Sequence, residues 1–200
     1  TSFNASVRGG QGQDTITTAL NTNFQNSGIF GDKGRDNIRL VGGTYDGTSV
    51  SGGEDADTIV VAGAAKGLIL DGNTGADNIF AAGTLGATVF GGNGDDTIAT
   101  GALIAGEKTK VDAGTGADAV TFLAGNAGEE TYVFNQGDSV AATSKTFASA
   151  GIQNQIAVGD TVTFKGGVVD TITGFNALTD KVDIDFTPAA VVDLLAVPAV

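Results

Sequence analysis

The sequence contains no cysteine, histidine, tryptophan or methionine, and only two prolines among its 200 residues. Without histidine and cysteine the chain cannot build a Ser-His-Asp or Cys-His nucleophile, a thiolate or imidazole zinc site, or a disulfide. No apolar run approaches the ~20 residues that a membrane-spanning helix needs. No basic segment precedes an apolar stretch, as it does in a signal peptide. We therefore expect a protein that is not an enzyme and that has no transmembrane segment.

Positive charge is also scarce, because 10 lysines and arginines stand against 23 aspartates and glutamates and leave a net charge of −13. Such a chain repels nucleic acid and anionic lipid and attracts cations. Of the acidic residues, 19 are aspartate and only four are glutamate, which favours a role in turns or in ion coordination. The 32 glycines and 41% hydrophobic residues indicate a folded chain with many tight turns between short strands.

An eight-residue pattern occurs six times along the chain. The copies are GGQGQDTI (9–16), GDKGRDNI (31–38), GGEDADTI (52–59), GNTGADNI (72–79), GGNGDDTI (91–98) and AGTGADAV (113–120). Their aspartates, Asp14, Asp36, Asp57, Asp77, Asp96 and Asp118, are 19 to 22 residues apart. Repetition at this spacing is typical of a solenoid built from stacked coils.

Two columns of apolar residues keep the same spacing as the aspartates. Two residues after each aspartate lie Ile16, Ile38, Ile59, Ile79, Ile98 and Val120, and seven residues before it lie Val7, Ile29, Val50, Leu70, Val89 and Val111. Their alternation with small or polar neighbours is typical of short strands. A coil of about 21 residues holds two such strands and two turns, and stacking buries the apolar face of each coil. The sequence predicts an all-β fold, a parallel β-solenoid.

The period ends near residue 130, which divides the chain into three parts. Residues 1–130 are predicted to form the solenoid with six motif-bearing coils, 131–186 a degenerate last coil and a β cap, and 187–200 an apolar tail. The second turn of each coil contains almost no acid, so ligand-like residues lie along one edge only. In the cap, Asp170, Asp180, Asp183 and Asp185 are expected to bind a further ion or to pair with Lys165 or Lys181. Glu129 and Glu130 are expected to be solvated.

The repeated turn Gly-Gly-x-Gly-x-Asp combines a flexible backbone with a short carboxylate. Glycine reaches φ > 0 and lets carbonyl oxygens converge without a Cβ clash. When coils stack, carbonyls and two aspartates surround the gap between consecutive turns. Such a gap suits Ca²⁺, which takes six to eight oxygens, better than Mg²⁺, which requires a tight octahedron. Six turns leave five gaps, so we expect about five calcium ions in one row.

These turns resemble the glycine- and aspartate-rich nonapeptide (RTX) repeats, GGxGxDxUx, and residues 91–99 are the best match. The resemblance implies a calcium-loaded parallel β-roll that bacteria export by type I secretion, and residues 166–186 look like the closing sequence of that family. The expected metal-binding residues are Asp14, Asp36, Asp57, Asp77, Asp96, Asp118, Gly10, Gly12, Asp32, Gly34, Gly53, Asp55, Asn73, Gly75, Gly92, Gly94, Gly114 and Gly116. Among these, Asp32, Asn73 and Asp55 replace glycines of the motif, as does Ala113 at the first position of the sixth copy.

Three other interpretations of these residues stay open. The aspartates could cap turns without any metal, although stacked carboxylates repel each other. The outward residues Thr15, Thr58 and Thr97 resemble an ice-binding array, but asparagines interrupt it. Asp95 and Asp96 resemble a glycosidase pair, but adjacent strand residues point to opposite faces.

From these observations we expect an extracellular, calcium-stabilised structural protein of the bacterial cell surface. It is expected to assemble with further copies of itself into a layer or fibre, because the first coil begins at Val7 with no cap before it and an open solenoid end can template strand pairing. The alternative is a secretion and folding module of a larger exported enzyme or adhesin. Cell-surface polysaccharide is a further partner class, although the absence of tryptophan argues against stacking on sugar.

Overall fold

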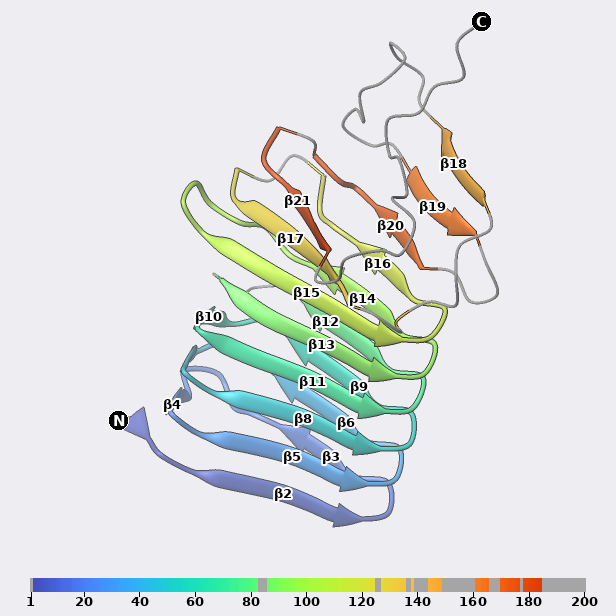
Figure 1. The fold of residues 1–200 in the computed structure, drawn as a ribbon. Coiled ribbons are helices and arrows are strands. Elements are labelled where there is room, and N and C mark those ends of the chain that lie inside the picture. The colour runs from blue at the N-terminus through green and yellow to red at the C-terminus, as the bar shows by residue number, and fades with distance from the viewer. Residues whose placement is uncertain are drawn as a thin grey trace, which may run out of the picture.

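The predicted parallel β-solenoid is confirmed by the computed structural model, in which strands of successive coils lie side by side in register (Figure 1). The structure describes residues 2–82, 86–124, 127–135, 138, 144–148, 161–165, 170–176 and 178–184. The tail 187–200 lies outside the described residues. Within the described ranges the structure contains no helix with the length and apolarity that crossing a bilayer requires.

Two long sheets form the walls of the solenoid. The first sheet consists of β2 (Ser6–Gln11), β5 (Gly28–Lys33), β8 (Ser49–Glu54), β11 (Leu68–Thr74), β13 (Ala87–Asn93), β15 (Lys108–Thr115), β17 (Glu129–Phe134) and β21 (Lys181–Ile184). The second sheet consists of β3 (Thr15–Thr17), β6 (Asn37–Leu40), β9 (Thr58–Val61), β12 (Asn78–Ala81), β14 (Thr97–Thr100), β16 (Ala119–Thr121) and β20 (Thr171–Thr173), followed by β19 (Thr161–Lys165) and β18 (Ser144–Ala148). Each motif copy spans from a strand of the first sheet to the next strand of the second.

A third, short sheet was not predicted from the sequence. It consists of β1 (Ser2–Phe3), β4 (Asn23–Gln25), β7 (Thr44–Asp46) and β10 (Ala64–Lys66), and it lies on the side of the coils opposite the motif turns. Each of β4, β7 and β10 buries one side chain, Phe24, Tyr45 or Ala65, and the rings of Phe24 and Tyr45 stack at 6.0 Å. One buried residue of changing type per coil leaves no repeating pattern to detect.

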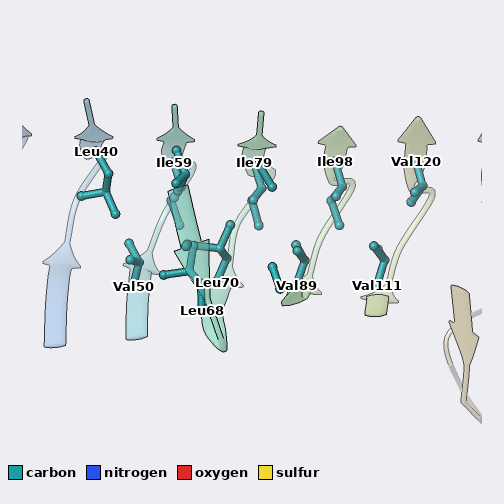
Figure 2. Close-up of a cluster of buried hydrophobic side chains, with 14 of the residues drawn as sticks. Leu40, Val50, Ile59, Leu68, Leu70, Ile79, Val89, Ile98, Val111 and Val120 are labelled. Carbon is teal, nitrogen blue, oxygen red and sulfur yellow. The ribbon is translucent and has the colours of Figure 1, made fainter. Parts of the chain in front are cut away.

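The two apolar columns predicted from the sequence face each other across the interior. Figure 2 shows Val89 and Val111 of the first sheet pointing toward Ile98 and Val120 of the second. Every column residue from the second to the sixth coil is at most 1% exposed. In the first coil Val7 and Ile16 are only partly buried, because no coil lies on their outer side. Stacking is therefore what buries the core.

The C-terminal strands continue the solenoid beyond the sixth motif. β17 pairs in parallel with β15 and places Tyr132 beside Val111, while β20 pairs in parallel with β16 and places Ile172 beside Val120. The chain between β17 and β20 contributes β18 and β19, which pair in an antiparallel manner and extend the second sheet. The last described strand, β21, pairs in parallel with β17.

The core predicts a clear contrast between neighbouring residues of β12. Ile79 is 1% exposed and Asn78 beside it points outward. We expect Ile79→Ala to lower the free energy of unfolding by about 3 kcal/mol, because it leaves a cavity between coils, and Asn78→Ala to change it by less than about 0.5 kcal/mol. Urea denaturation of both variants measures the difference. Equal effects would show that stacking of the apolar columns does not hold the coils together.

Candidate metal-binding turns

The six motif turns lie one above another along a single edge, where each strand of the first sheet leads into the second (Figure 1). The aspartates of consecutive turns are joined by hydrogen bonds. The backbone amide of each aspartate donates to the Oδ1 atom of the aspartate in the next coil, from Asp14 to Asp36 at 2.8 Å and so on through Asp96 to Asp118 at 2.8 Å. We call these six residues the aspartate column.

The second oxygen of every carboxylate in the aspartate column has no protein partner. Asp36, Asp57, Asp77, Asp96 and Asp118 are each 1% exposed, and the Oδ2 atoms of all six aspartates are buried without a hydrogen bond. A buried acceptor that lacks a donor is costly, and a buried carboxylate costs more than a neutral group. The column therefore requires a positive charge or a proton that the described residues do not supply.

In the first five motifs the first glycine lets the backbone approach this oxygen more closely than a side chain would allow. A methyl group placed on Gly9, Gly31, Gly52, Gly72 or Gly91 would lie within 2.9 Å of the Oδ2 atom of its own coil's aspartate and of the carbonyl oxygen at the same position in the next coil. The strand pairing of the first sheet skips this position, since Arg8 pairs with Phe30 and Gly10 with Asp32. A carboxylate oxygen and a carbonyl oxygen thus converge on one small space in five successive gaps.

The backbone conformation of the turn determines which residues occupy the second and fourth positions of the motif. All of these residues have positive φ, including Asp32 (79°), Asp55 (77°) and Asn73 (73°), which are residue types that tolerate this conformation. The Asp32 carboxylate is paired with Arg8, and the Asn73 amide donates to Ser51 Oγ at 2.7 Å. The backbone conformation accounts for which residues replace glycine here. That the side-chain oxygens of Asp32, Asp55 and Asn73 also bind an ion stays a prediction.

Carbonyl oxygens of these positions also point into the gaps between turns. A methyl group on Gly53 would meet the carbonyl of Asp32, and one on Gly75 would meet the carbonyl of Asp55. The described part of the chain contains no group of three or more acidic side chains that could hold a metal ion. Any cation here would therefore be held by carboxylates of the aspartate column together with backbone carbonyls and water. Hard cations such as Ca²⁺ accept such a mixed oxygen set.

Burial changes the acidity of the column. It raises the pKa of Asp57 to about 6, of Asp96 to about 7 and of Asp118 to about 8, and the neighbouring carboxylates add to the effect. Burial likewise raises the pKa of Asp77 above its ordinary value. In the metal-free fold Asp96 and Asp118 thus keep part of their protons near neutral pH, and a cation bound there would displace them.

A seventh aspartate, expected from the sequence in the cap, extends the column. Asp170 is fully buried and its Oδ1 accepts the amide of Asp118 at 3.2 Å, while its Oδ2 accepts the hydroxyl of Tyr132 at 2.7 Å. Lys181, one of the two lysines expected as possible partners of the cap aspartates, binds Glu129. The tripeptide Asp170-Thr171-Ile172 repeats the end of the motif, with glycine kept only at the second motif position (Gly166), and could have indicated this aspartate in the sequence.

The expectation for the neighbouring glutamates is only half right. Glu129 binds Lys108 and Lys181 at the surface. Glu130, expected to be solvated, is fully buried and accepts a hydrogen bond from the Thr100 hydroxyl. The alternation of β17 decides this, since Glu129 and Glu130 point to opposite faces of the strand.

Comparison of the chain with protein-family models, curated proteins and solved structures gave no match. The interpretation of the turns therefore rests on the residues and contacts of this chain alone.

The acidity of the column predicts an inverted pH dependence of the metal-free protein. Because burial raises the carboxylate pKa values, the metal-free fold is most stable below about pH 4 and loses stability as pH rises through about 6 to 8. Melting temperatures in chelator should therefore be higher at acidic than at alkaline pH. Asp77→Asn should weaken this dependence, whereas Asp46→Asn, an equal charge change at an exposed site on β7, should not. Greater stability at alkaline pH in chelator would show that the buried carboxylates do not have raised pKa values.

Proposed function

We propose that the motif turns bind a row of about five calcium ions, one in each gap between consecutive coils. The observation that supports this is the set of six buried Oδ2 atoms without a partner, five of which lie beside the first glycine of their motif and near a carbonyl oxygen of the next coil. Ca²⁺ suits a flexible site built of carboxylate, carbonyl and water oxygens, whereas Mg²⁺ dehydrates reluctantly. The resemblance of the turns to RTX repeats points in the same direction.

Calcium binding on this scheme is part of folding. The five ions would carry about ten positive charges against a net charge of −13, which offsets most of the repulsion along the stack. Without ions or protons the buried carboxylates oppose folding, so the apo chain near neutral pH should be largely unfolded. The low calcium of a bacterial cytoplasm would leave weak sites empty, and the millimolar calcium outside would fill them. The protein would then fold after export.

Calcium titration followed by circular dichroism tests the metal assignment. At neutral pH the strand signal should appear with millimolar Ca²⁺, disappear with chelator and fail to appear with equal Mg²⁺. Asp77→Asn removes a carboxylate in the middle of the row and should raise the calcium midpoint several-fold, while Asp46→Asn serves as the charge-matched control. A chain that keeps its full strand signal in chelator at neutral pH would show that the turns need no ion.

The first coil supplies a surface for assembly. Its strands β2 and β3 each pair on one side only, and Val7 and Ile16 are partly exposed while their counterparts in coils two to six are buried. Among the described residues Asp14 Oδ1 receives no amide, although the corresponding atom of each later aspartate in the column receives one. Another stacked chain could supply both the missing amide and the missing apolar contact.

We therefore propose an extracellular structural role, in which copies of this calcium-stabilised solenoid assemble through the first coil into a surface layer or fibre. The second candidate is a folding and secretion module of a larger exported enzyme or adhesin. It is favoured by the same open coil, because further coils of one longer chain would cover it equally well.

Sedimentation at increasing protein concentration in millimolar calcium tests the assembly. We expect large particles from the wild type and none from Ile16→Lys, which places a charge on the open end of the core. Thr17→Lys adds the same charge on the outward face of β3 and should still assemble. A wild type that stays monomeric at high concentration would exclude assembly and would favour the folding and secretion module. If both variants lost assembly equally, assembly through the first coil would be excluded.

A further inference from the structure

The seventh aspartate differs from the other six in the contact of its second oxygen. In the six members of the aspartate column the Oδ2 atom is buried without a partner. In Asp170 the same atom accepts the Tyr132 hydroxyl at 2.7 Å, while Oδ1 keeps the amide contact of the column, from Asp118 at 3.2 Å. The carboxylate of Asp170 therefore has a protein donor at the position where the others require a cation.

Tyr132 reaches this position because of where it stands in the first sheet. It occupies the apolar column, beside Val111, where the six motif-bearing coils have valine, isoleucine or leucine. Its side chain is 1% exposed, and its hydroxyl crosses from β17 to Asp170, just before β20 of the second sheet. Burial and the adjacent carboxylate raise the pKa of Tyr132 far above its ordinary range, so the hydroxyl remains a donor.

The sixth coil shows a second change at the same end. Its first motif residue is Ala113 instead of glycine, and it is fully buried. The neighbouring pairs Phe90–Asp112 and Gly92–Gly114 place it in register with Gly91. Its methyl group thus stands at the position where a methyl group in the five preceding coils would lie within 2.9 Å of the aspartate Oδ2 atom and of the next carbonyl oxygen.

We propose that Tyr132 closes the row of calcium sites, with its hydroxyl taking at Asp170 the place that an ion takes at the other carboxylates. The inference rests on the calcium binding proposed above and gives the row a defined end. Asp170 adds no ion to the row, because the Tyr132 hydroxyl satisfies its Oδ2 atom. The number of ions then stays at about five although the column has seven aspartates.

Counting bound calcium in two aspartate variants tests the end of the row. Asp170→Asn should bind as many ions as the wild type, measured by equilibrium dialysis with elemental analysis, because Asp170 is no ligand. Asp77→Asn, the same change within the row, should bind at least one ion fewer. If Asp170→Asn also loses an ion, the proposal is overturned.

Removing the Tyr132 hydroxyl tests whether this donor takes the place of an ion at Asp170. Tyr132→Phe leaves the Asp170 Oδ2 buried without a partner, so we expect one additional ion per chain and a steeper rise of melting temperature with calcium concentration. Tyr45→Phe is the matched control, because its hydroxyl is also buried and bonded, to Thr18 at 2.7 Å, but lies away from the turns. A Tyr132→Phe chain with an unchanged ion count, or one that does not fold in excess calcium, overturns the proposal.

The wild-type measurement separates this proposal from the one on which it rests. If the wild type binds no calcium, both the calcium function and the closing role of Tyr132 fall. If it binds calcium but the count for Tyr132→Phe does not change, only the closing role falls.

Discussion

A line of buried carboxylates runs the length of the solenoid, and the rest of the molecule depends on how its charge is compensated. From Asp36 onward, each aspartate of the column accepts an amide hydrogen bond from the preceding coil at Oδ1, and all six leave Oδ2 without a protein donor. The apolar columns bury well only when coils are stacked, and stacking brings the carboxylates together. Hydrophobic burial thus favours the same arrangement that electrostatics opposes, and protons or cations decide which of the two prevails.

Most of the fold could be predicted from the sequence, because the residues that repeat from coil to coil are of the same chemical type. The apolar columns contain only β-branched residues or leucine, and the aspartates keep one phase, so stacking follows from the sequence. The third sheet was not readable, since Phe24, Tyr45 and Ala65 share neither size nor chemistry. The candidate site was predicted in its aspartates and its glycines. The carbonyl at the first motif position was not predicted, because every residue has a backbone carbonyl and its identity does not indicate which carbonyl lies near the site.

The two ends of the column are built differently. At the first coil Val7 and Ile16 remain partly exposed and Asp14 lacks the amide that later carboxylates receive. At the other end the Tyr132 hydroxyl donates to Asp170 within the chain. The contact between Asp170 and Tyr132 was not predicted, because the two residues are 38 positions apart, with β18 and β19 between them, and no local spacing links them.

Coil length varies without disturbing the turns. Successive aspartates are 19 to 22 residues apart, yet their amide contacts stay between 2.7 and 2.8 Å from Asp14 to Asp118. The difference in length is taken up on the opposite side, around β4, β7 and β10, where each strand buries a single side chain. That side is therefore the natural place for grafted peptides, and the solenoid could serve as a display scaffold whose inserted sequences repeat at the spacing of adjacent β-strands, about 4.8 Å.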